Sequence, residues 1–356
     1  MYVVDISETE AMSSILSSLF SKVTSHISGH VPDPEELMKQ GWDKEKKLNY
    51  YPKLSYEENL AKYKDVRYIY ETAYQLGVTR ALSSIGMLMR TFMKFIADTY
   101  VIVVREEETT INDLFVEISQ TFFSDIIAIY NRAIIELSNT KQTYTDPTPM
   151  LDLIGSVHNN LGNLLCYGLV AKRTHPREIT HIIVEPDLNE GIKYLIYPCE
   201  KLHDYPSCYN IAAFYRTAAD KLSIQSDTKI MYYQTSITSS INFFKNVGKM
   251  IETHKQNEGE IMKFFGNLLE NVKHCNDKIR SLSTTEDIIK QFEHTQTQLQ
   301  QFIDEYHIRI SSQKPDAPEK QGGKTLSMKY NRTSNKSRNY KKGRRHKKSR
   351  KGRSKK

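Results

Sequence analysis

Residues 157–165 read VHNNLGNLL, and this stretch decides the fold class. Its apolar residues recur at the spacing of an amphipathic helix, with Gly162 directly beside Leu161. The same pattern, apolar positions at helical spacing with a small or aromatic residue among them, returns in residues 65–77, 81–89, 125–137, 189–203, 207–215 and 229–236. Short polar turns separate these segments. The sequence therefore predicts an all-α fold.

The chain resembles the tetratricopeptide family, and more closely its SEL-like relatives, in how small and aromatic residues are placed. Three residues match the small position in the first helix of a family pair: Gly86, Gly162 and Ala212. Others match the aromatic and small positions of the second helix: Tyr70 with Ala73, Tyr130 with Ala133, and the degenerate copies Leu195 with Pro198 and Tyr233 with Ser236. The resemblance covers residues 65–240. It implies an irregular α-solenoid with a groove for a peptide or a partner protein.

The spacing of these positions predicts insertions in the array. Tyr70 and Tyr130 are 60 residues apart and Tyr130 and Leu195 are 65, whereas the interval from Leu195 to Tyr233 is 38, near the family period. Residues 101–104 and 179–184 are β-branched, so we predict short strands that form small hairpins inside the insertions. An ordinary irregular helical bundle is the alternative fold.

A stricter heptad pattern follows residue 240. Apolar residues alternate by four and three in a first segment: Ile261, Phe265, Leu268, Val272, Cys275, Ile279 and Leu282. A second segment continues the pattern: Ile289, Phe292, Gln296, Leu299, Ile303, Tyr306 and Ile310. The short turn between them predicts an antiparallel helical hairpin that docks on the repeats or on a second copy of the chain, which would make a homo-oligomer.

The patterns divide the chain into four regions. We predict an N-terminal helix and linker in residues 1–55, with the helix at 8–27 and a loop at 29–55. The helical repeats occupy residues 56–240, the antiparallel hairpin 241–312 and a disordered basic tail 313–356.

The last 37 residues, 320–356, hold 17 of the 50 Lys and Arg residues and no Asp or Glu, so the tail carries +17. The rest of the chain has 33 basic against 42 acidic residues, a net charge of −9. A cationic run of this kind repels itself, stays extended and binds phosphates by counterion release. We predict DNA or RNA binding through Lys341, Lys342, Arg344, Arg345, Lys347, Lys348, Arg350, Lys351 and Arg353. A nuclear-import signal, an acidic protein partner and an anionic membrane are the alternatives.

The start of the tail partly matches the motif of a phosphate-binding loop. Residues 322–325 read GGKT, the end of a phosphate-binding loop, but Pro318 stands where the first glycine of that motif belongs. The composition of the tail is similar to that of tails in proteins of large nucleocytoplasmic DNA viruses. This likeness implies a viral structural or genome-packaging component as an alternative function.

Cysteine usage and hydropathy indicate the compartment. The four cysteines form no CxxC pair, so reduced thiols and an intracellular location, cytoplasmic or nuclear, are expected, or the virion or infected cell if the chain is viral. No apolar run predicts a transmembrane segment.

The SEL-like resemblance implies disulfides between the helices of a pair; it sets Cys199 opposite His158 and Cys208 opposite Ile237, so neither has a mate. Cys199 and His203 share a helix face as two metal ligands could, but no fourth ligand is evident, and no metal or cofactor is expected.

No catalytic motif is present: the sequence lacks HExxH, GxSxG and a GxGxxG after a strand. His158, His181 and Asp187 could act as catalysts in principle, yet lone polar residues beside helical seams are more often surface or capping groups. We expect a non-enzymatic protein–protein interaction scaffold with a polyanion-binding tail. The alternatives are a packaging component and an enzyme with an unrecognised helical active site.

Overall fold

The computed structural model describes residues 33–52, 54–105, 108–140, 148–174, 178–221, 226–253 and 257–282, with positions 297, 300, 301 and 304. By its contacts the chain divides into two units, Met1–Glu305 and Tyr306–Lys356, and every described residue belongs to the first. The helix predicted at residues 8–27 lies outside the described residues.

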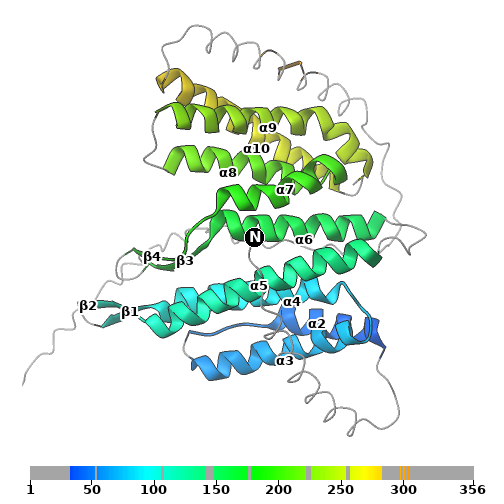
Figure 1. The fold of residues 1–356 in the computed structure, drawn as a ribbon, viewed down its shortest axis with the longest axis vertical. Coiled ribbons are helices and arrows are strands. Elements are labelled where there is room, and N and C mark those ends of the chain that lie inside the picture. The colour runs from blue at the N-terminus through cyan, green and yellow to red at the C-terminus, as the bar shows by residue number, and fades with distance from the viewer. Residues whose placement is uncertain are drawn as a thin grey trace, which may run out of the picture. The chain divides into compact units, whose positions relative to one another are not determined.

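The described part of the chain is mostly helical, which confirms the predicted class at that level (Figure 1). Its helices are α2 (Pro34–Lys47), α3 (Tyr56–Gln75), α4 (Ala81–Ile96), α5 (Asp113–Thr140), α6 (Thr148–Tyr167), α7 (Leu188–Leu202), α8 (Tyr205–Lys221), α9 (Ser226–Thr253) and α10 (Glu258–Leu282). Each helix from α2 to α9 packs against the next one along the chain, and α10 returns onto α9 and α8. Helices α6 and α8 also touch.

Helix α2 was missed in the sequence, where residues 29–55 were predicted to form a loop; that prediction was wrong. The helix begins at Pro34 after Asp33, whose side chain accepts a hydrogen bond from the Glu35 N–H. Proline at the first helical position, acidic residues in the first turn and lysines in the last turn all favour a helix here. The segment is strongly polar on average, yet its few apolar residues share one helix face.

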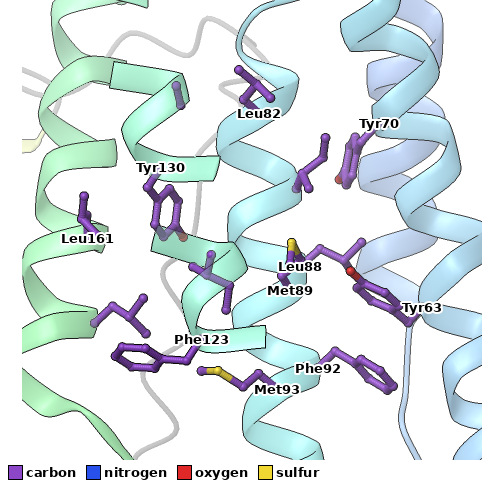
Figure 2. Close-up of a cluster of buried hydrophobic side chains, with 14 of the residues drawn as sticks. Tyr63, Tyr70, Leu82, Leu88, Met89, Phe92, Met93, Phe123, Tyr130 and Leu161 are labelled. Atoms are coloured by element: carbon purple, nitrogen blue, oxygen red, sulfur yellow. The ribbon is translucent and has the colours of Figure 1, made fainter. Parts of the chain in front are cut away.

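Aromatic and aliphatic side chains from α2 to α6 form one continuous core (Figure 2). Tyr63 of α3 stacks on Phe92 of α4 with ring centroids 4.6 Å apart, and Phe122 of α5 meets both rings edge to face. Aromatic pairs of this geometry stabilise by about 0.5–1.5 kcal/mol beyond the area they bury. Through these rings α3, α4 and α5 share one packed interior.

Two β-hairpins interrupt the helices, as the sequence predicted. Strands β1 (Ile102–Arg105) and β2 (Glu108–Ile111) lie between α4 and α5, after a π-helical turn at Ala97–Val101. Strands β3 (Leu169–Arg173) and β4 (Ile179–Val184) lie between α6 and α7. Strand β3 packs against β1 and the π-helical turn, so the hairpins are neighbours (Figure 1). Each hairpin lengthens the connection between two helices that pack together.

Helix α10 buries the apolar residues predicted as the first heptad seam, except Leu282, which is 37% exposed. The partners of this seam in the described part of the chain are α9 and α8. Helix α9 runs through residue 240 without a break, so the predicted boundary between repeats and hairpin falls inside a helix. The second half of the predicted hairpin lies outside the described residues except for positions 297, 300, 301 and 304, which are helical.

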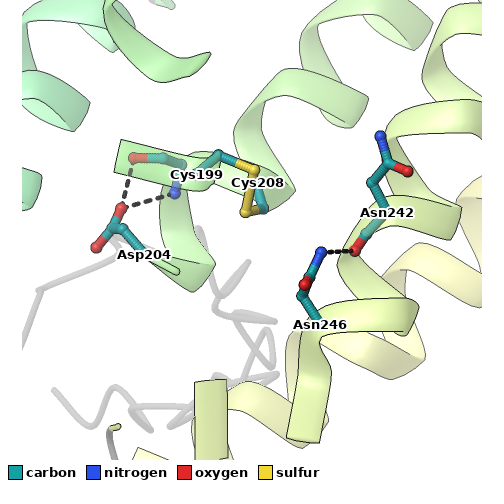
Figure 3. Close-up of a disulfide and its surroundings, with 6 residues drawn as sticks. Cys199, Asp204, Cys208, Asn242 and Asn246 are labelled. Carbon is teal, nitrogen blue, oxygen red and sulfur yellow. Dashed lines mark hydrogen bonds between the residues drawn. A yellow bond between two sulfur atoms is a disulfide. The ribbon is translucent and has the colours of Figure 1, made fainter. Parts of the chain in front are cut away.

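The prediction that Cys199 and Cys208 lack mates was wrong, because the two form a disulfide with each other (Figure 3). His203 ends α7 in the left-handed conformation, with φ of 54°. The Asp204 carboxylate accepts from the Ser207 N–H at 3.0 Å, which starts α8 at once. This tight reversal brings the two cysteine Cα atoms to 4.8 Å. The disulfide therefore joins α7 to α8.

Candidate functional site: a binding surface on α6 and α8

Close approach between paired helices occurs where the sequence places small residues. A Cβ added at Gly86 of α4 would lie 2.4 Å from the Tyr130 ring of α5, and one at Gly41 of α2 would lie 2.4 Å from the Tyr70 ring of α3. Real Cβ atoms do not come so close to a ring carbon, so only glycine lets these tyrosines pack flat on the neighbouring helix. Gly41 packs against Tyr70 but was not among the predicted packing residues, because residues 29–55 were predicted to form a loop.

Helices α6 and α7 approach through two glycines. A Cβ at Gly162 would lie 2.6 Å from Leu195 Cγ and 2.8 Å from the carbonyl oxygen of Gly191. A Cβ at Gly191 would lie 2.7 Å from the carbonyl oxygen of Gly162 and 2.4 Å from Cys166 Sγ. Each glycine thus faces the backbone of the other.

The other predicted packing residues are also inside. Ala73 and Ala133 are fully buried. Ala212 is fully buried, and its carbonyl oxygen accepts a hydrogen bond of 2.7 Å from Ser236 Oγ of α9. Tyr233 of α9 is buried and donates to the Asp220 carboxylate of α8 at 2.7 Å. Ala212, Tyr233 and Ser236 therefore lie in the contact between α8 and α9.

Helices α6 and α8 meet at Asn159, Asn163, Tyr167, Asn210 and Phe214, a set that we call the α6–α8 surface; Tyr167 is its exposed member, whereas Asn159 and Phe214 are buried. Asn210 Nδ2 donates to Asn159 Oδ1 at 2.8 Å, and Tyr167, 58% exposed, meets Phe214 edge to face at 4.7 Å. Asn163 Oδ1 is buried without a hydrogen-bond partner in the described part of the chain. The Asn159 and Asn210 amides pair with each other, so the exposed ring of Tyr167 is the group of this set that a partner can reach.

A polar cluster, buried at Asn271 and Ser236 and partly exposed at Asp220 and His274, ties α8 to α9 and α10. The Asp220 carboxylate accepts from Tyr233 and is 2.9 Å from His274 Nε2, while Asn271 Nδ2 donates to Ser236 Oγ at 2.8 Å. Burial by itself raises the pKa of Asp220, but the hydrogen bonds from His274 and Tyr233 outweigh it and hold that pKa below its usual value. Carboxylate, imidazole and phenol in contact resemble parts of a proton-transfer site.

The neighbouring thiol is not poised to react. Burial raises the pKa of Cys275 to about 11, so this thiol stays protonated at neutral pH. Thiolate, not thiol, is the nucleophile in cysteine chemistry. The cluster as it stands can cross-link three helices, which is a structural role.

Of the three residues considered for catalysis in the sequence, His158 has packing contacts and Asp187 caps a helix. His158 of α6 packs between Tyr194 and Tyr197 of α7, and its pKa is lowered by burial. Asp187 caps α7 by accepting from the Glu190 N–H at 2.9 Å. His181 lies on β4 opposite Ala171.

The described residues contain neither a metal-site grouping of side chains nor a membrane-spanning helix. No group of three or more His, Cys, Asp or Glu side chains there has the arrangement of a metal site. None of the helices in the same residues could cross a membrane, being too short or too polar. The cations predicted to bind nucleic acid, residues 341–353, lie outside the described part of the chain.

Comparison with known proteins gave no significant match, whether to protein-family models, to curated proteins or to solved structures.

Proposed function

We propose that this chain is a non-enzymatic interaction scaffold that holds a partner protein or peptide on a helical body and a polyanion on a cationic tail. The observation that carries the proposal is the division of charge, +17 in residues 320–356 against −9 in the rest. A body of that sign does not attract nucleic acid, so polyanion binding falls to the tail.

The body, in this proposal, is an irregular α-solenoid of tetratricopeptide-like or SEL-like pairs. Contacts between helices adjacent in the chain, with Gly41, Gly86, Gly162 and Ala212 at the pair interfaces, support it. The α6–α8 surface is the place proposed for a peptide, because Tyr167 offers an exposed ring there.

The tail binds DNA or RNA through charge and not through base sequence. Each phosphate neutralised releases a counterion, so the slope of log K against log salt is about −0.9 per contact on a duplex. Nine contacts, one for each predicted cation, give a slope of about −8. An intracellular setting follows from this partner and is part of the proposal.

The experiment compares the full chain with a form ending at residue 319. Fluorescence anisotropy with labelled DNA and RNA duplexes, at two salt concentrations, should show strong salt-dependent binding by the full chain only. A third protein, with the nine predicted cations changed to glutamine, keeps tail length and lowers the tail charge from +17 to +8. Equal affinity of the full and shortened chains would refute the polyanion role.

The same titration also distinguishes an adaptor from a packaging component. An adaptor binds the duplex as a discrete complex, whereas a packaging component forms large assemblies on it. Light scattering during the titration distinguishes the two.

A further inference from the structure

The edge of strand β2 is open in the described part of the chain. The edge of β4 is covered because Gln120 Nε2 of α5 donates to the Ile183 carbonyl oxygen at 3.1 Å. The edge of β1 is covered because Arg173 Nη1 donates to the Ile102 carbonyl oxygen at 2.9 Å. Strand β2 pairs with β1 on one side, and its first three residues are exposed. An edge of this kind can accept a further strand.

The register of the hairpin shows which backbone groups β2 directs outward. Asn112 N donates to the Val101 carbonyl oxygen at 2.9 Å, and hydrogen-bonded pairs alternate along an antiparallel ladder. Thr110 therefore directs its backbone groups at β1, whereas Thr109 and Ile111 direct theirs away from it. A strand added at this edge would form its main-chain hydrogen bonds with Thr109 and Ile111.

An open cleft of about 460 Å³ lies on one face of β2. Thr110 lines it together with Val103, its cross-strand partner, and with Glu108, two residues away on the same face. Asp113 and the 60% exposed Leu114, at the start of α5, also line it. Among the described residues of this lining, the charged ones are Glu108 and Asp113, and both are acidic. The cleft therefore favours a cation.

The opposite face of the hairpin is apolar. Val104 and Ile111 lie on that face, are partly buried and pack against the core of α2 to α6. Successive residues of a strand point to opposite faces, so an added strand would place its side chains alternately beside Ile111 and in the cleft. Apolar side chains fit the first position and cations the second.

We propose that the edge of β2 binds an extended basic segment of a partner protein as a third strand. Five residues of this segment run antiparallel to residues 108–112. The first and the fifth point into the cleft, toward Asp113 and Glu108, and are lysine or arginine. The second and the fourth lie beside Ile111 and Thr109, form the main-chain hydrogen bonds and are apolar.

Charge distinguishes this occupant from a second copy of the chain. Two copies of β2 side by side would bring Glu108 and Asp113 of both copies to one edge, where like charges repel. A basic strand instead neutralises both carboxylates. Main-chain hydrogen bonds give such strand addition its affinity, and alternate side chains give it selectivity.

The inference goes beyond the proposed function, because this edge is a second protein-binding site that involves neither the α6–α8 surface nor the tail. A negative result at β2 leaves the proposals for that surface and for the tail unchanged.

Fluorescence anisotropy with the full chain and labelled peptides tests the proposal. The probe is the peptide KVTVK, flanked by glycine and serine. Methylating the backbone nitrogens of its two valines removes the donors that face β2, whereas methylating that of its threonine removes one that faces away. The valine-methylated peptide should bind at least about tenfold more weakly than the parent, and the threonine-methylated peptide within about twofold of it. Equal binding of all three would overturn the proposal, since it would show only a general attraction of cations to an acidic body.

Variants of the protein test the same contact from the other side. Thr109→Pro deletes an outward N–H and leaves the donors of the β1–β2 ladder in place, and Thr109→Ala is its control because it keeps that N–H. Only Thr109→Pro should weaken binding of the probe, by at least about fivefold. Equal binding by the two variants would contradict pairing at this edge. Self-association of the full chain that Thr109→Pro abolishes would assign the edge to a second copy and overturn the proposal.

A second probe tests the part played by charge. A peptide with glutamine in place of both lysines should bind the native chain about three- to tenfold more weakly than the lysine probe. The two probes should bind equally well to a Glu108→Gln/Asp113→Asn protein. A difference between them that persists in this protein would refute the assignment of the cations to the cleft.

Discussion

The contact between α6 and α7 gives the sharpest test of helix packing, and the substitution Gly162→Ala probes it. A Cβ at this position would lie 2.8 Å from a backbone oxygen, that of Gly191, so no rotamer change can relieve the clash. Gly155 lies on the same helix, and a Cβ there would meet nothing closer than 3.4 Å, an ordinary contact with Asp204. Gly155→Ala is therefore a matched control.

Two effects determine how much each alanine substitution changes the free energy of unfolding. Alanine in a helix interior is favoured over glycine by about 0.5–1 kcal/mol, and this gain applies at both positions. Overpacking costs about 1–3 kcal/mol, and the upper part of that range applies when the clash is with backbone. We expect Gly155→Ala to stabilise by about 0.5–1 kcal/mol and Gly162→Ala to destabilise by about 1–2 kcal/mol.

Urea unfolding followed by far-ultraviolet circular dichroism measures both changes, provided the slope with denaturant is the same in all three proteins. The test is whether the free energy of unfolding rises in Gly155→Ala and falls in Gly162→Ala. If both alanine variants were stabilised to the same extent, the close approach of α6 to α7 at Gly162 and Gly191 would be refuted.

Two further predictions concern cross-links in the body. Reductant should lower the free energy of unfolding by about 2–3 kcal/mol, because the Cys199–Cys208 disulfide closes a loop of about ten residues, and it should have no effect on a Cys199→Ala/Cys208→Ala protein in the same urea titration. For Asp220, whose folded pKa is depressed, the stabilisation is present above the unfolded value of about 3.9 and is lost as pH falls through the folded pKa. Asp220→Asn should therefore destabilise at pH 6 and make little difference at pH 2.5, with exposed Asp277→Asn as control; a pH-independent difference would contradict the His274 and Tyr233 contacts.

The sequence predicted the helical class and several interior contacts because these depend on local pattern. Gly86 and Gly162 were chosen for their place in helical segments, and both lie where a helix backbone meets a neighbouring side chain. The hairpin strands were found for the same reason, since a β-branched run is a local signal. The long intervals after Tyr70 and Tyr130 hold these hairpins and the long helix α5.

What the sequence did not predict depends on partners distant in the chain or on the path of a turn. Helix α2 is strongly polar on average, and the need for glycine at Gly41 becomes evident only from its contact with Tyr70 of α3. The Cys199–Cys208 bond requires the left-handed turn at His203, a conformation uncommon for a non-glycine residue.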